Sequence, residues 1–293
     1  MSLPIEFVDS HVHFWDHAQT GLTWRYLAAD FDHPRLRGMH RLDAPRFTSA
    51  ELREHAGDRA PTKIVHVQSC EEDRPGMESA WLQSIADADG SIHAIVARAR
   101  VAEPDLATAL DANSRFALVR GFRDMASPLT IGSQSFTDGF DQIADRGLSL
   151  EVLVPYPKFE AVCALADRRP EATIVLGHAG LAEHRDPDYF DAWSRHLGMF
   201  STRPNVVVKI SALASGADPN WTTDSIRAWA EWCIDVFGSE RAMFASNWPI
   251  DRLYGSYERL VDAYLDIATR YTEAQRRDLF HATATRVYRL DQP

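Results

Sequence analysis

Two histidines, His11 and His13, close a short apolar run, and Asp9 stands two residues before the first of them. On a β-strand, alternate residues project to the same side, so a carboxylate and two imidazoles would converge on one space. Two imidazoles at this spacing can share a divalent cation. A chain with 12 histidines can also bring two together by chance. The rest of the sequence must therefore decide between a functional site and ordinary histidines.

The elements that would position these residues are short β-branched runs separated by amphipathic stretches. Near-continuous apolar runs are typical of strands buried on both faces of a parallel sheet. Apolar residues at helical spacing lie between them, for example over 157–168. We expect strands at 5–9, 63–68, 92–98, 118–122, 148–154, 173–177, 206–210 and 242–246. This alternation predicts one α/β domain over residues 1–293, a (β/α)8 TIM barrel. A doubly wound sheet is the alternative fold, but the glycine-rich first turn that usually marks it is missing from the sequence.

Composition narrows the class of protein further. The chain has 293 residues, 45% of them hydrophobic, and a net charge of −11. This charge argues against nucleic acid or an anionic membrane as a partner and leaves a small-molecule substrate. Three widely spaced cysteines, no apolar run long enough to span a bilayer and no signal-peptide pattern favour the cytoplasm. The sequence leaves open whether the protein forms a homo-oligomer.

Polar residues gather where the predicted strands end, which is where barrel enzymes place their chemistry. The bodies of the same strands stay mainly apolar. The residues at or just beyond these ends include Gln68, Arg123, Glu151, Tyr156, His178, Lys209, Asn247 and Asp251. A purely structural barrel would have no reason to place imidazoles in this way.

Five segments make the pattern recognisable. They are VDSHVHFWD at 8–16, VRGFR at 119–123, GHAG at 177–180, RAMFASNWP at 241–249 and ATATRVYRL at 282–290. With these segments in order along nearly the whole chain, the sequence resembles the amidohydrolase superfamily. The resemblance is to its amidohydrolase-2 branch of metal-dependent hydrolases, which includes sugar-lactone lactonases such as L-fuconolactonase and L-rhamnonolactonase.

The resemblance implies a hydrolytic site in which His11, His13 and His178 surround either a divalent metal or the attacking water. Zinc is the leading candidate for that metal. The family usually has an aspartate after strand eight that binds the metal and accepts the water's proton. This chain has Asn247 at that position, and an amide is a weak metal ligand that cannot act as a base. Three consequences are open: the metal binds weakly through the three imidazoles, the metal is absent, or catalysis has been lost altogether.

Roles for the other polar residues follow. His178 is our candidate for the general base, with Glu151 and Asp251 as alternatives, and activity would then rise with pH near ~6.5, the ordinary histidine pKa. We expect Arg123 to bind a substrate carboxylate or the polarised carbonyl, the alternative being an ion pair with Asp124. Asp9 is expected to orient a histidine or to close the barrel.

We expect the substrate pocket to be lined by Trp15, Gln68, Arg123, Tyr156 and Trp248. The alternative for the aromatic residues is that they pack in the hydrophobic core. The long first connection, 16–61, either folds over the barrel mouth or forms a surface excursion. The leading hypothesis is a hydrolase that opens a lactone by attack of water at the carbonyl. The alternatives are a decarboxylase of the same branch and a degraded barrel that only binds a small molecule.

Overall fold

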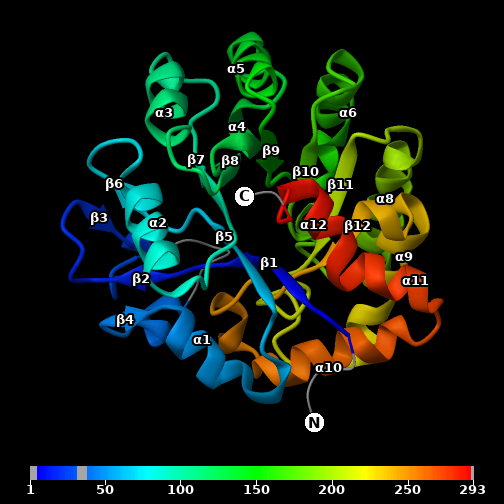
Figure 1. Cartoon of the computed structure of the whole chain (residues 1–293). Helices are drawn as coiled ribbons and strands as arrows, with labels where there is room; N and C mark the ends of the chain where they lie inside the picture. The colour runs from blue at the N-terminus through cyan, green and yellow to red at the C-terminus, as the bar shows by residue number, and fades with distance from the viewer. Residues whose placement is uncertain (1–4, 32–37, 292–293) are drawn as a thin grey trace.

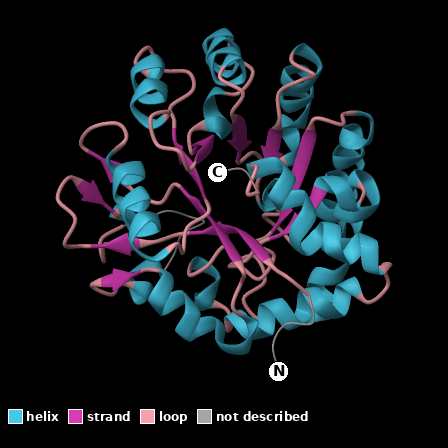
Figure 2. Cartoon of the chain, viewed as in Figure 1, coloured by secondary structure: helices cyan, strands magenta, loops and turns pink. Residues whose placement is uncertain are grey.

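A computed structural model describes residues 5–31 and 38–291 of the chain. Eight parallel strands form one sheet, in which neighbours in space are also neighbours in the order β1-β5-β7-β8-β9-β10-β11-β12. The sheet curves into a barrel enclosed by helices (Figures 1 and 2). The strands are β1 (Val8–Val12), β5 (Lys63–Val67), β7 (Ala94–Arg98), β8 (Val119–Asp124), β9 (Ser149–Val152), β10 (Ile174–Leu176), β11 (Val206–Ile210) and β12 (Ala242–Phe244). The predicted (β/α)8 barrel is confirmed.

The helices lie outside the strands because each has one apolar face. In α9, for example, Ile226, Trp229, Ala230 and Cys233 are buried at helical spacing. The α-helices are α1 (Ser49–Ala56), α2 (Met77–Asp89), α3 (Leu106–Asn113), α4 (Ser127–Thr130), α5 (Gln134–Asp145), α6 (Phe159–Arg168), α7 (His178–Leu181), α8 (Pro187–Leu197), α9 (Thr223–Phe237), α10 (Tyr257–Ala268), α11 (Glu273–Arg277) and α12 (Thr283–Tyr288). No helix in the described part of the chain is both long and apolar enough to cross a membrane.

Short helical turns complete the connections between these elements. They are η1 (Arg25–Leu27), η2 (Met39–Leu42), η3 (Gly57–Arg59), η4 (Tyr156–Lys158), η5 (Gly198–Thr202), η6 (Ser239–Arg241), η7 (Ile250–Leu253) and the π-helical η8 (Asp278–Ala282). Strand β1 begins three residues later than predicted, and its register with β5 is irregular between Asp9 and Val12. His11 consequently lies within the strand, whereas the sequence placed it beyond the strand end.

The barrel closes between its first and last strands through few backbone contacts and one buried carboxylate. Val12 forms an isolated parallel bridge with Trp248, and the His13 backbone N–H donates to the Trp248 carbonyl at 2.8 Å. Asp9 accepts hydrogen bonds from the Ser246 backbone N–H at 3.0 Å and from the Tyr257 hydroxyl at 2.8 Å. Asp9 thus ties β1 to the segment after β12 and to α10.

The amino-terminal end of the barrel is filled by small apolar side chains and one tyrosine. Tyr288 of α12 is fully buried against residues that point inward from the strands, among them Val65, Val96 and Val207. Lys63, the first residue of β5, holds the chain just after α12 by donating to the Leu290 carbonyl at 3.3 Å. Figure 1 shows α12 over the centre of the barrel. In the described part of the chain, this packing leaves no room for a ligand at the amino-terminal end.

The first connection spans the carboxyl end of the barrel. It contains β2 (Trp15–Asp16), paired with β4 (Arg46–Phe47), and β3 (Leu22–Thr23), paired with β6 (Glu71–Glu72) beyond the end of β5. The turn η2 packs against η7, which follows β12. The connection therefore reaches from the β5 side of the mouth to the β12 side. We call the described residues 16–31 and 38–48 the cover; His33 lies outside the described residues.

Candidate active site

Three imidazoles meet at the carboxyl end of the barrel. His11 lies in β1, His13 follows that strand, and His178 begins the turn after β10. The Nε2 atoms of His11 and His13 are 3.2 Å apart, and the ring centroids of His11 and His178 are 4.6 Å apart. His178 has a φ of +53°, an uncommon value for a residue with a side chain. The convergence expected from the sequence is present.

Burial keeps the three imidazoles neutral. It lowers the pKa of His13 to about 3, an effect to which the nearby Arg123 charge adds. Burial likewise lowers the pKa values of His11 and His178 well below the ordinary value. With Nδ1 of His13 2.8 Å from the Val67 carbonyl, that nitrogen must carry the proton, so Nε2 keeps its lone pair for the cluster. His178 is held similarly, with Nδ1 2.8 Å from the Ser211 hydroxyl.

A buried ion pair supports His11 from inside the barrel. One carboxylate oxygen of Glu151 lies 2.7 Å from Lys209 Nζ, and the other lies 3.3 Å from His11 Nδ1. Lys209 also stands 5.2 Å from the centroid of the Tyr288 ring. Both Glu151 and Lys209 are buried, where each needs the other's charge. Glu151, an alternative general base in the sequence analysis, therefore acts here as a counter-ion beside His11.

Arg123 is a buried cation with few partners. Its side chain is only 4% exposed, its Nη1 is 3.4 Å from the Gln68 carbonyl, and its Nε has no hydrogen-bond partner among the described residues. The alternative ion pair with Asp124 is not formed, because that carboxylate accepts from the backbone N–H groups of Val101 and Ala126. Burial lowers the pKa of Arg123. Its guanidinium is free to bind a substrate oxygen.

Asn247, at the position after strand eight, lies beside Asp251, a contact that the sequence only suggested. Its Nδ2 donates to Asp251 Oδ1 at 2.8 Å, and both residues are buried. Burial raises the pKa of Asp251 well above the ordinary value, which favours its neutral acid form. The structure pairs Asp251 with Asn247 and so brings it to the edge of the cluster.

The cluster does not fit a tightly held divalent metal. Within residues 5–31 and 38–291, no group of three or more His, Cys, Asp or Glu side chains is arranged to hold one. The Nε2 atoms of His11 and His13 lie 3.2 Å apart, as two ligands of one ion could, but an amide replaces the usual carboxylate. The charges of Arg123 and Lys209 are close enough to lower the pKa of His11, and they would also oppose a cation there.

The predicted aromatic residues of the pocket have other partners. Trp15 packs on Phe47 with centroids 5.2 Å apart, and its indole N–H donates to the Ala44 carbonyl. Trp248 donates to His55 Nδ1 at 3.1 Å. At 1% and 2% exposure these two tryptophans are core residues, which argues against their expected contact with substrate. Tyr156 packs against Tyr189 and His196.

Tyr26, to which the sequence analysis gave no role, reaches toward the site from the cover. Its hydroxyl is buried, with the Ser69 side chain close enough to influence its pKa. Burial raises its pKa, and Glu78, Cys70 and Arg123 are close enough to shift it further. The only sequence signal was the aromatic pair Trp24 and Tyr26 after the histidine motif. Nothing in that pattern showed which way the tyrosine would point.

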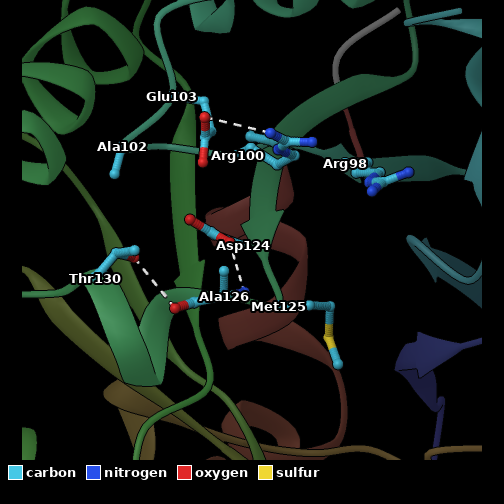
Figure 3. A pocket seen from close by; sticks show the side chains of 9 residues that line it. Arg98, Arg100, Ala102, Glu103, Asp124, Met125, Ala126 and Thr130 are labelled. Carbon is cyan, nitrogen blue, oxygen red and sulfur yellow. Dashed lines mark hydrogen bonds and ion pairs between the residues drawn. The ribbon is translucent and has the colours of Figure 1, made fainter.

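A small pocket opens where β7 and β8 end (Figure 3). Its volume is about 150 Å³, and none of the three clustered histidines lines it. Arg100 and Glu103 pair across 3.2 Å at its rim, while Asp124 accepts the Ala126 N–H at 2.7 Å. These three charged groups therefore bind each other or the backbone, and the pocket is separate from the three clustered histidines.

Comparisons with known proteins agree with this geometry. The sequence profile of the family Amidohydro_2, described as Amidohydrolase, matches residues 8–290. An uncharacterized protein y4mH of Sinorhizobium fredii is 31% identical over 98% of this chain and 99% of its own length. An L-fucono-1,5-lactonase of Burkholderia multivorans is 29% identical over 98% of this chain and 97% of its own. A crystal structure of an amidohydrolase from Burkholderia multivorans with bound Zn has a TM-score of 0.80 and 26% identity, covering 97% of this chain and 99% of that one.

Proposed function

The chain belongs to the amidohydrolase family and is a hydrolase, and from that premise we propose that it opens a lactone ring by attack of water at the ring carbonyl. The observation that carries the proposal is Arg123, a buried guanidinium without an ion-pair partner in the described structure, close to three neutral imidazoles. This combination suits a carbonyl that gains negative charge as water attacks. The similarity to an L-fucono-1,5-lactonase supports the same reaction.

The reaction consumes one water and yields a hydroxy acid. Water adds to the carbonyl carbon while a neutral imidazole accepts its proton, and Arg123 stabilises the oxyanion that forms. The ring C–O bond then breaks, and the leaving alkoxide takes a proton. We assign the base to His178, because Nδ1 lies against Ser211 and Nε2 is left to face the substrate. Lactones are activated esters, so this scheme routes no step through a metal.

The pH dependence expected from the sequence has to be corrected. Burial lowers the pKa of His178 well below the ordinary value, so the neutral base persists into acidic solution. We now expect the activity to rise with pH below ~6.5 and to be level through neutrality. A pH profile of kcat/KM checks this shift.

The two alternatives raised by the sequence have less support. A decarboxylase would need a firmly held metal, which the cluster does not fit. A barrel that only binds its ligand would have no need for imidazoles gathered around one space beside an unpaired arginine.

Turnover of a lactone panel tests the proposal. Aldonolactones and muconolactone-type lactones are incubated with the protein, with and without chelator, and acid release is measured. We expect turnover of at least one class, little effect of chelator, and a loss of about 10²-fold or more in His178→Asn. His281→Asn, which pairs with Glu6 just before β1 at the opposite end of the barrel, is the matched control. No turnover of any lactone would refute the proposal, whereas a fully active His178→Asn would show that His178 is not the base.

A further inference from the structure

The residue that replaces the family's usual aspartate is held by the carboxyl group four residues later. Asn247 has a φ of +56°, a left-handed conformation that asparagine adopts more readily than most residues. Its backbone carbonyl accepts from the Ile250 N–H at 2.9 Å and from the Asp251 N–H at 3.4 Å, so the chain turns back into η7. This turn brings the Asp251 side chain to the Asn247 amide, where Nδ2 donates to Oδ1 of Asp251 at 2.8 Å.

The hydrogen bond to Asp251 decides which way the Asn247 amide faces. A carboxylate only accepts, and a neutral carboxyl group still offers its carbonyl oxygen, so Asp251 presents an acceptor to Nδ2 in either form. Rotating the amide by half a turn would set its own oxygen against that acceptor. Because both side chains are buried, the conflict would be costly, and the observed orientation is therefore favoured.

The carbonyl oxygen of the amide consequently faces the histidines. Burial lowers the pKa of His13, and a hydrogen bond with the Asn247 side chain acts in the opposite direction. Only an acceptor favours a protonated imidazole, so this contact belongs to the Asn247 oxygen. Nδ1 of His13 is bonded to the Val67 carbonyl, which leaves Nε2 as the nitrogen beside that oxygen.

This arrangement sets two acceptors side by side while His13 is neutral. Nε2 of His13 keeps its lone pair, and so does the Asn247 oxygen, so neither can bond to the other. A donor must occupy the space that they share, and water is the donor that a hydrolysis consumes. If one O–H of this water points to the Asn247 oxygen and the other to His178, the base assigned above, a lone pair is left for the lactone carbonyl.

We propose that Asp251 is a positioning residue that holds the carbonyl oxygen of Asn247 toward the histidines, where it accepts one O–H of the attacking water. This inference rests on the proposed lactonase function and adds to it the orientation of the nucleophile. The proton that leaves the water goes to His178, while the O–H bound by Asn247 stays intact in the new carboxyl group. Asp251 itself exchanges no proton with the water, unlike in the alternative raised by the sequence.

Two substitutions of Asp251 separate an acceptor from a proton carrier. Asp251→Asn keeps an oxygen for Nδ2 of Asn247, so kcat for an aldonolactone should stay within about threefold of the wild type. Asp251→Leu removes the acceptor, and kcat should fall about tenfold or more while KM changes less than about twofold, because the water loses its orientation. A fall of kcat in Asp251→Asn as large as in Asp251→Leu would overturn the proposal, even if the leucine variant does not fold.

A double variant shows whether Asp251 acts through Asn247. If it does, Asn247→Leu combined with Asp251→Leu should have the kcat of Asn247→Leu alone. Losses that multiply would mean that Asp251 acts on the substrate directly, against the proposal. Asp278→Leu is the matched control, because Asp278 accepts from the Ser239 hydroxyl at 2.7 Å where η6 precedes β12, at the amino-terminal end of the barrel. It should keep the kcat of the wild type.

The side-chain amide of Asn247 gives a readout that needs no turnover. Its proton–nitrogen resonances are assigned by their absence in Asn247→Leu. In Asp251→Leu the proton that is bonded to Asp251 should move upfield and exchange faster with solvent, whereas in Asp251→Asn it should stay near its wild-type position. If the wild type opens no lactone, the proposed function fails, but this shift still supports the hold of Asp251 on the amide. An unchanged amide resonance in Asp251→Leu refutes that hold.

Discussion

Arg123 is the residue at which function and stability conflict most clearly. A guanidinium that is 4% exposed and has no ion-pair partner in the described structure lowers stability, and burial lowers its pKa for the same reason. Arg123→Met should therefore reduce lactone turnover by about 10²-fold or more while leaving the melting temperature unchanged or raised. Kinetics and thermal unfolding of the purified variant check both parts.

Arg120 gives a matched control for this prediction. It stands on the same strand, but its guanidinium donates to the Ala117 carbonyl before β8 begins. Arg120→Met should keep the turnover of the wild type. If Arg123→Met instead unfolds early and retains its specific activity, Arg123 is a structural residue.

Asn247 makes the metal content of the protein testable. Because an amide stands in the aspartate's place and two cations lie nearby, we expect divalent metal to be substoichiometric or readily chelated. Asn247→Asp should bind zinc more tightly, although the new carboxylate would lose the present hydrogen bond to Asp251. Elemental analysis after dialysis against chelator measures both proteins. A full equivalent of zinc retained by the wild type would contradict the prediction.

At the scale of single residues, the sequence predicts which residues lie close together better than it predicts which way their side chains point. The proximity of His11, His13 and His178 could be predicted because the carboxyl ends of parallel strands meet at one edge of the sheet. Trp15 and Trp248 stand in the same motifs, yet their rings turn into the core. A rotamer depends on neighbours that are remote in the chain, such as Ala44 for Trp15 and His55 for Trp248.

At the scale of elements, the interior of the barrel explains contacts that no local pattern contains. Glu151 on β9 meets Lys209 on β11, although β10 lies between these strands in the sheet. Inward side chains of alternate strands share one layer in a (β/α)8 barrel, so strands that are not neighbours touch through their side chains. The strands themselves were predictable from apolar runs. The pairing of these charges required the closed barrel.

Helix α2 carries a carboxyl group that should make stability depend on pH. Burial raises the pKa of Glu78 to about 7 from the usual 4.5. Between these values the folded state keeps a proton that the unfolded state releases, so stability falls as the pH rises through this window, by up to about 3 kcal/mol. Glu78→Gln should remove this loss.

The measurement is thermal unfolding at pH 5 and pH 8. The melting temperature of Glu78→Gln minus that of the wild type should be larger at pH 8 than at pH 5. Glu160→Gln, an exposed residue of α6, should show no comparable trend. Parallel pH curves for Glu78→Gln and the wild type would mean that Glu78 titrates normally in the folded protein.

At the scale of the whole molecule, the cover shows where sequence patterns stop being informative. Its strands are two residues long and its helical turns are three or four, too short for periodicity to mark them. Their positions depend on long-range contacts, such as Trp24 with Ser69 and η2 with η7. The order of strands and helices in the barrel was therefore predictable from the sequence, whereas the position of Tyr26 was not.

Closure of the barrel should depend on Asp9 more than on any backbone ladder. Among the described residues, one isolated bridge joins Val12 to Trp248, while Asp9 accepts from the Ser246 N–H and the Tyr257 hydroxyl. Asp9→Ala would leave these buried donors unpaired, and we expect a loss of about 3 kcal/mol or more in the free energy of unfolding, measured with urea. Tyr257→Phe removes one donor together with its need for a partner, so it should cost about 1 kcal/mol. Equal losses in the two variants would mean that apolar packing, and not the carboxylate, holds the first and last strands together.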